Sequence, residues 1–486
     1  MAPKPPVDKT FRAFDPGQGL LLPPSLEDWL PAEHLARFIA ELVDEHLDLS
    51  RIRAAYTEGR GGPPYDPRLM VRILLYGYTI GVRSSRAIEV RCTDDVAFRW
   101  LAAGAGPDYR AIARFRKRHL SALGHLFVQA LALCQAAGMV RLGRVALDGT
   151  KVRANASKRK AMSYARMSEK EKVLADEVSA LLVQAQRIDK AEDARYGKNN
   201  RGDELPEQLR RRETRLATIR EAKAALEDEA AHAARQRAET AARDRGDDED
   251  TAAAQGAAAA DAATPKPKAQ RNFTDPDSKI MLTGDGAFHQ CYNAQAVVDE
   301  DHQVIVATDV NTNAADVGNL IPMTEQTAAN TGQAPGQMLA DAGYCSADNL
   351  ERADEFSDQH GTEFYVATGR SRPDEPPPVA ARGRIPKSAT SKQRMARTLT
   401  TKKGRAIYAR RKGLASYCTS WGGWDVNSFS QRAALSGGEA GVGMTRAKNR
   451  LVLTRARERL LLATCHNLRK LHGVIGVHGL AALAPT

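Results

Sequence analysis

Two aspartates, each placed directly after a short apolar run, are the residues of this chain best suited to chemistry. Asp148 follows the run 145–147 in "VALDGT", and Asp341 ends the run in "QMLADAGYC". Ligand sites of open α/β sheets lie beyond strand ends, so neighbouring strands would bring these carboxylates together. Side by side they repel each other, and Mg²⁺ (or Mn²⁺) resolves this because it binds carboxylate oxygens and substrate phosphate. The pair therefore predicts a catalytic metal site.

A single aspartate at a strand end is more often a cap or a turn residue, so the prediction depends on the pair. Two metal ions about 3.5–4 Å apart can activate a water or a 3′-hydroxyl and stabilise the leaving oxygen. The cations that follow Asp148 would then hold the phosphate backbone of the strand to be cut. These cations are Lys151, Arg153, Lys158, Arg159 and Lys160.

Positive charge is concentrated in the last third of the chain. The net charge is +12, but residues 381–470 contain 21 Lys and Arg against three acids, so the rest of the chain is net negative. Such a block indicates binding to a polyanion, because neutralised phosphates release counterions. A solvated surface is the alternative, which the scarcity of compensating acids disfavours.

The first 140 residues predict a helical domain. In "YDPRLMVRILLYGYTIG", Asp66 caps a helix that begins with Pro67. Short helices followed by a basic one are similar to a helix-turn-helix arrangement, although many helical domains share this pattern. DNA contact and a solvated helix face are equally weighted for the basic stretch. Its residues are Arg114, Arg116, Lys117 and Arg118.

Beyond residue 144 the pattern predicts a mixed α/β sheet interrupted by a helical insertion. A first strand covers 144–153, and apolar residues at heptad spacing over 165–245 indicate an antiparallel helical hairpin. The alanine-rich "DDEDTAAAQGAAAADAATPKPKAQ" is expected to be a mobile linker. A β-hairpin with the turn "DEDH", a helical crossover and strands in "QMLADAGYC" and "TEFYVATGR" follow.

Several of these segments together resemble bacterial insertion-sequence transposases with a DDE, RNase H-like catalytic domain. They include "VALDGTKVRANASKRKAMSYARM", "GDGAFHQCYNAQAVVDEDHQVIVATDV", "QMLADAGYCS" and, nearer the N-terminus, "YDPRLMVRILLYGYTIGVRSSRAIE". The similarity covers roughly residues 10–412 and returns at "LLATCHNLRKLH". It implies that Asp148 and Asp341 are the first two acids of a catalytic triad. In such enzymes these acids bind Mg²⁺ or Mn²⁺ and drive hydrolysis and transesterification at transposon ends.

The resemblance also extends to a basic run and to the partners. Tyr408, Arg411 and Lys412 match the family's basic run and are expected to contact phosphate. Double-stranded DNA, as transposon ends and target, is the expected partner, bound by a homodimer or a larger assembly. No apolar stretch of 18 residues and no secretory h-region is present, so we expect a cytoplasmic, nucleoid-associated protein without membrane contact.

Five segments are expected from these patterns. They are a helical DNA-binding-like domain (1–140), the first catalytic strand (141–160), a coiled-coil-like insertion with a linker (161–270), the rest of the catalytic domain (271–412) and a basic divergent segment (413–486).

The divergent segment departs from the family where the third acid is expected. Ser416 stands about where a glutamate begins a helix in the family. Glu439 lies in the glycine-rich "SGGEAGVG", which suits metal binding poorly, and Glu458 in "TRARERLL" fits an ordinary helix surface. Two interpretations stay open: a working DDE transposase, or a catalytically inactive relic that still binds DNA.

Overall fold

A computed structural model describes most of the chain. The described residues are 25–57, 62–154, 156–196, 207–369, 386, 388–414 and 450–483. They form two compact units, the helical unit (residues 1–119 with 471–486) and the sheet unit (residues 120–470). No helix in these described ranges has the length and hydropathy needed to cross a bilayer.

The helical unit consists of short helices, as the sequence predicts for this region. Asp66 caps α4, accepting the N–H of Arg68, and Pro67 occupies the first turn. Asp108 caps the longer α7 in the same way. The elements are α1 (Leu26–Trp29), α2 (Leu35–Glu41), η1 (Leu42–His46), α3 (Ser50–Arg53), α4 (Pro67–Thr79), α5 (Ser85–Asp94), α6 (Val96–Leu101), the start of α7 (Tyr109–Ala136) and η7 (Leu480–Ala482).

The sheet unit is built around a mixed sheet with the strand order β4-β5-β1-β7-β8, in which β6 also pairs with β5. β1 runs antiparallel to β5 and parallel to β7, and β7 is parallel to β8. The first strand, the hairpin and the two later strands lie where the sequence predicts them, whereas β4 was not anticipated. The strands are β1 (Val145–Arg153), β4 (Lys279–Leu282), β5 (Phe288–Asp299), β6 (Ile305–Asn311), β7 (Gln337–Ala340) and β8 (Glu363–Val366).

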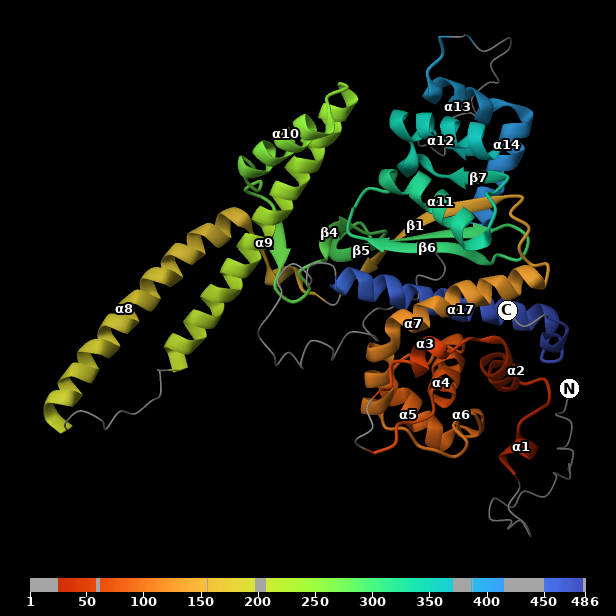
Figure 1. Cartoon of the computed structure of the whole chain (residues 1–486), viewed down its shortest axis with the longest axis horizontal. Helices are drawn as coiled ribbons and strands as arrows, with labels where there is room; N and C mark the ends of the chain where they lie inside the picture. The colour runs from red at the N-terminus through yellow and green to blue at the C-terminus, as the bar shows by residue number, and fades with distance from the viewer. Residues whose placement is uncertain are drawn as a thin grey trace, which may run out of the picture. The chain divides into compact units, whose positions relative to one another are not determined.

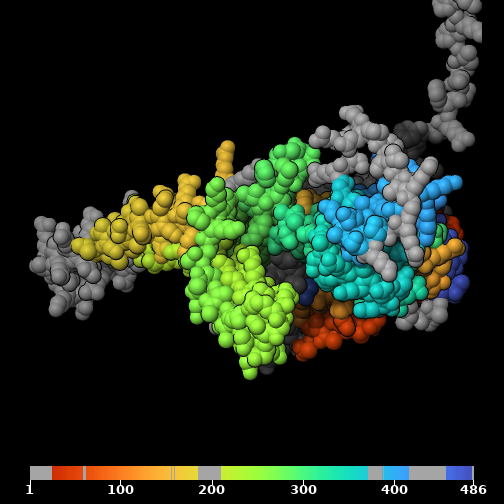
Figure 2. Space-filling model, turned by 90° about the horizontal axis from the view of Figure 1, so that it is seen from above, coloured from red at the N-terminus to blue at the C-terminus, as the bar shows by residue number. Residues whose placement is uncertain are grey.

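Helices cover this sheet. α11 packs on β5 and β6, whereas α12, α13 and α14 contact β8, and α13 also contacts α12 and α14 (Figure 1). In the space-filling view the residues coloured turquoise to blue, which include these helices, lie together (Figure 2). Side chains alternate along a strand, and even-numbered residues of β1 pack toward two helices: Ala146 clusters with Ile407 of α14, and Val152 belongs to a cluster that also contains Ala456 of α17. The bounds are α11 (Leu320–Thr331), α12 (Ala347–His360), α13 (Ser391–Thr400), α14 (Lys402–Ala409) and α17 (Arg450–Ile475), with the short turns η3 (Val317–Asn319) and η4 (Ala342–Tyr344).

Two long helices between β1 and β5 form the antiparallel hairpin that the heptad pattern predicts. They are α8 (Tyr164–Tyr196) and α9 (Glu207–Asp244), which lie side by side in Figure 1. Ion pairs show that the two helices run antiparallel. Glu177 pairs with Arg212, whereas Glu171, nearer the start of α8, pairs with Arg220, which lies later in α9. The buried apolar residues between them are Met167, Leu174, Leu216, Ile219, Ala222 and Leu226.

The alanine-rich stretch expected to be a mobile linker is instead largely helical. α10 (Glu249–Asp261) packs along α9, and Asp248 caps it by accepting the N–H of Thr251. Alanine is the best helix former, and Gly256 allows the Glu239 side chain of α9 to approach closely. The low-complexity composition was misleading because helix propensity and a tertiary contact act together. Short strands follow nearby: β2 (Ala161–Ser163), beside the turn η2 (Lys158–Lys160), pairs with β3 (Gln270–Asn272).

The C-terminal helix α17 is hydrogen-bonded to the β5–β6 hairpin through the side chain of Asn467, which pairs with backbone groups as a neighbouring strand would. Asn467 accepts the backbone N–H of Ile305 and donates to its carbonyl, both at 2.9 Å, and all three groups are buried. The next residue back, His466, uses Nε2 to contact the backbone carbonyl of Gln303 at 2.9 Å.

We expect Asn467→Ala to lower the free energy of unfolding by about 2–4 kcal/mol, because two buried backbone groups of Ile305 lose their partners. Urea denaturation followed by circular dichroism measures the change. Arg469→Ala, at an exposed position on the same helix, is the matched control. A loss equal to that of the control would contradict this role of Asn467.

His466 makes stability depend on pH. Burial lowers its pKa to about 4, with Lys470 and Arg469 acting in the same direction. The unfolded chain therefore binds a proton between pH 6.5 and 4 that the folded chain does not, so stability is full above pH 6.5 and falls as the pH drops toward 4. At about 1.4 kcal/mol per unit of pKa, the loss is about 3 kcal/mol.

His466→Gln keeps a donor for the Gln303 carbonyl but cannot titrate. Urea denaturation at pH 5 and pH 7.5 should show a smaller pH difference for this variant than for the natural chain. An unchanged difference would place the titration elsewhere.

Candidate functional site

The sheet register brings the two predicted catalytic aspartates together. β1 and β7 are parallel neighbours, with Ala146 opposite Leu339. Asp148 and Asp341 each come two residues after this aligned pair, so their positions correspond in the register. Asp148 lies within β1, which continues to Arg153, and not at the strand end that the sequence predicts, because pairing with β5 extends the strand beyond its apolar run, whereas Asp341 directly follows β7. Asp341 caps the turn η4, accepting the N–H of Gly343 at 2.8 Å.

The environment of Asp148 disfavours its charge. Its side chain is only 12% exposed. Burial raises the pKa of Asp148 to about 6, Arg411 opposes this rise, and the carboxylates of Asp341 and Asp316 add to it. A cation placed between the carboxylates would stabilise their charged forms.

The donors fit a hard divalent cation. Asp148 and Asp341 offer carboxylate oxygens only, and Mg²⁺ is usually held by one or two carboxylates together with waters and substrate phosphates. Within the described ranges, no group of three His, Cys, Asp or Glu side chains is arranged to hold a metal ion. The pair therefore suits a cation that takes its other ligands from water and substrate.

Arg411 lies beside Asp148 on the face covered by α14. Its Nη1 is 3.8 Å from Asp148 Oδ1 and forms no hydrogen bond with the described residues, although it is buried. The guanidinium lies 5.9 Å from the ring of Tyr408. Two of the three residues in the predicted basic run therefore face the acidic pair, whereas Lys412 is exposed.

A third carboxylate, Asp316, belongs to this region and was missed from the sequence. It precedes η3, and its Oδ1 accepts three hydrogen bonds: from Lys151 Nζ (3.0 Å), Asn293 Nδ2 (2.7 Å) and Gln295 Nε2 (3.0 Å). Lys151, predicted to contact DNA, is thus paired inside the protein. The signal was available, because Asp316 in "NAADVGN" lies between an expected strand and its crossover helix, where sheet ligands gather.

Gly149 leaves room for this arrangement. A Cβ there would lie 2.6 Å from Gln295 Nε2, 2.8 Å from Asp316 Oδ1 and 3.2 Å from the Tyr344 hydroxyl. Tyr344 also donates to Gln295 Oε1, and it follows Asp341 in η4. Buried polar groups therefore connect the strand of Asp148 with the turn of Asp341.

Family comparisons agree with this geometry. Residues 24–118 match a model described as "Transposase domain (DUF772)", and residues 264–414 match a model described as "Transposase DDE domain". The chain belongs to the insertion-sequence DDE transposases. The second match contains Asp316, Asp341 and Arg411, whereas Asp148 precedes it. No curated protein and no solved structure matches the transposase.

The other predicted DNA contacts of the sheet unit lie on its surface. Arg153 forms an ion pair with Asp285, and Arg159 and Lys160 are exposed. The side chain of Lys158 lies outside the described residues.

In the helical unit the structure separates the basic stretch of α7 into two kinds of residue. Arg114 and Lys117 are exposed and available to a ligand. Arg116 donates to the Tyr78 hydroxyl at 2.8 Å and has a packing role within the unit. Arg118 is exposed, and its guanidinium also lies 4.8 Å from the ring of Tyr56.

The segment expected to hold the family's third acid, which includes Ser416 and Glu439, lies outside the described residues. Glu458 lies on α17, as its helical pattern indicates.

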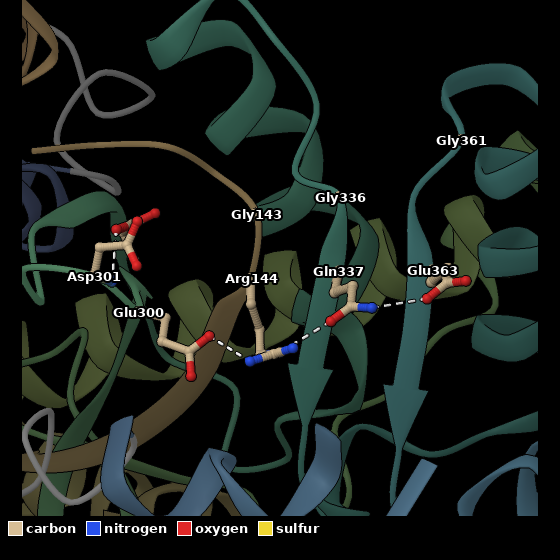
Figure 3. A pocket seen from close by; sticks show the side chains of 9 residues that line it. Gly143, Arg144, Glu300, Asp301, Gly336, Gln337, Gly361 and Glu363 are labelled. Atoms are coloured by element: carbon tan, nitrogen blue, oxygen red, sulfur yellow. Dashed lines mark hydrogen bonds and ion pairs between the residues drawn. The ribbon is translucent and has the colours of Figure 1, made fainter. Parts of the chain in front are cut away.

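A hollow of about 490 Å³, separate from the acidic pair, opens where β1, β7 and β8 begin (Figure 3). There Arg144 pairs with Glu300 and donates to Gln337 Oε1 at 2.9 Å, and Gln337 donates to Glu363 at 2.8 Å. Because these side chains form hydrogen bonds and ion pairs with one another, we assign them a structural role: they join the starts of β1, β7 and β8.

We expect Gly149→Ala to lower the free energy of unfolding by about 1–3 kcal/mol, because the methyl group overlaps Gln295 and Asp316. Gly143→Ala, where a Cβ has no neighbour within 4 Å, is the control and should change it by less than about 0.5 kcal/mol. Urea denaturation measures both. Equal effects would show that the network tolerates a side chain at position 149.

Proposed function

We propose that this transposase cuts and joins the ends of its insertion sequence, with Asp148 and Asp341 holding Mg²⁺ or Mn²⁺. The observation that carries the proposal is the parallel register of β1 and β7, which gives the two aspartates corresponding positions at one sheet edge. Bound in this way, the metal would activate a water or a 3′-hydroxyl and stabilise the leaving oxygen, in a two-metal arrangement.

The protein groups around the pair have distinct tasks in this proposal. Asp148 and Asp341 would hold the metal ion, which would supply positive charge at the scissile phosphate. Arg411 contacts a phosphate oxygen, because a guanidinium matches phosphate geometry and its Nη1 has a free hydrogen-bonding position among the described residues. Tyr408 supports that arginine through its ring.

Most of the remaining assignments from sequence enter the proposal, whereas Lys151 and Arg116 are paired within the protein and are left out as DNA contacts. The mixed sheet is the RNase H-like catalytic core, interrupted by the helices α8 to α10, and the helical unit contacts DNA through the exposed Arg114 and Lys117. Arg153, Arg159, Lys160 and Lys412 are exposed enough to follow the DNA backbone. Double-stranded DNA in the nucleoid of the cytoplasm is the substrate, and a homodimer or larger assembly acts on it.

A catalytically inactive relic that binds DNA is the second candidate. The supporting observation is that, in the described ranges, Asp148 has a guanidinium at 3.8 Å and the acidic side chains do not form a three-ligand metal group. This candidate retains the basic surfaces and lacks strand cleavage.

Excision of a marker flanked by the element's own ends tests the first candidate. If the first candidate is right, the natural chain excises the marker, and Asp148→Ala or Asp341→Ala lowers excision at least about a hundredfold, because each removes a ligand of the ion that stabilises the transition state. Asp354→Asn, which removes an exposed carboxylate paired with Arg394, is the control and should retain excision.

A gel shift with the same ends distinguishes the two candidates. Binding by all variants together with excision by the natural chain supports the enzyme. Binding without excision by any chain, including the natural one, supports the relic.

A further inference from the structure

We propose that Asp316 is a positioning residue of the transposase: it neutralises Lys151, so that a divalent cation rather than this ammonium occupies the acidic pair. The inference rests on the proposed metal site at Asp148 and Asp341. It concerns a residue that neither binds the scissile phosphate nor belongs to that pair.

Strand geometry places Asp316 and Asp148 on different faces of the sheet. Side chains of β1 alternate, so Asp148 shares a face with Ala146 and α14, while Gly149 and Lys151 point to the other. Asn293 and Gln295 lie opposite Lys151 and Gly149 in the register with β5. These odd-numbered positions are the ones that contact Asp316, which explains why it does not complete a three-acid group with Asp148.

Asp316 nevertheless lies close to Asp341. A Cβ on Gly343 would be 3.0 Å from Asp341 Oδ1 and 3.5 Å from Asp316 Oδ2. The oxygen of Asp316 that does not accept from Lys151 therefore faces the turn that carries Asp341. Lys151, whose side chain is 19% exposed, lies 3.0 Å from the other oxygen.

Charge balance determines which carboxylate Lys151 approaches when the negative charge of Asp316 is removed by substitution. A poorly solvated ammonium needs a counterion, because unpaired buried charge is costly. Without Asp316, Asp341 is the adjacent carboxylate that Lys151 can approach, and an ammonium there competes with a metal ion for the same oxygens. With Asp316 charged, Lys151 is satisfied on its own face and the acidic pair stays available.

Asp316→Asn is the sharpest test, because asparagine keeps the shape and an acceptor for Asn293 and Gln295 but loses the charge. Isothermal titration calorimetry of Mn²⁺ binding to the full chain gives a readout independent of catalysis. We expect the affinity to fall about tenfold or more, as a unit charge at this distance in a partly buried site predicts. Asp354→Asn is the control for loss of a remote carboxylate and should leave Mn²⁺ binding unchanged.

Removing the ammonium separates a charge effect from a structural one. Lys151→Gln alone should bind Mn²⁺ at least as well as the natural chain, and Lys151→Gln combined with Asp316→Asn should restore most of the lost affinity. A double variant as weak as Asp316→Asn would mean that Asp316 supports the fold only and would overturn the inference. If Asp316→Asn does not fold, weaker Mn²⁺ binding by Lys151→Gln would overturn it as well.

Asp148→Ala distinguishes this inference from the proposed function. Loss of Mn²⁺ binding in Asp148→Ala together with unchanged binding in Asp316→Asn would reject the role of Asp316 and retain the metal site. Absence of Mn²⁺ binding to the natural chain would reject both.

Discussion

Repulsion between carboxylates brought close together is the constraint on which the functional part of this structure depends. The parallel pairing of β1 and β7 places Asp148 and Asp341 side by side, and Asp316 adds a third negative group. In a partly buried site such charges interact far more strongly than in water. The neighbouring residues are arranged in ways that offset this repulsion without filling the edge of the sheet.

Different residues offset the repulsion between carboxylates on the two faces of the sheet. On the face of α14, Arg411 approaches Asp148 but stays at 3.8 Å, too far for a hydrogen bond, so that both remain open to a ligand. On the other face, Lys151 and two buried side-chain amides donate three hydrogen bonds to one carboxylate oxygen of Asp316. Gly149 is the position where the backbone of β1 lets these groups meet.

Elements far from the site keep the strands in register. The C-terminal α17 uses Asn467 to complete the hydrogen bonds of Ile305, and Arg144, Gln337 and Glu363 connect three strands at their other ends. A shift of one residue in β1 would turn Asp148 to the wrong face, since side chains alternate. Contacts of this kind therefore support the site without touching it.

The sequence by itself determined most strands of the sheet, the apolar runs that precede the two aspartates and the helical hairpin, because apolar runs and heptad spacing are local signals that tertiary contacts reinforce. It also carried the family's motifs, and the family matches confirm the transposase. It could not show that α10 is a helix, that Arg116 packs on Tyr78, or that Lys151 is paired inside the protein. Those outcomes depend on partners distant in the sequence: Asp316 lies 165 residues from Lys151. Only the folded sheet decides which charges meet, because strand alternation and pairing, not composition, set the face on which each side chain lies.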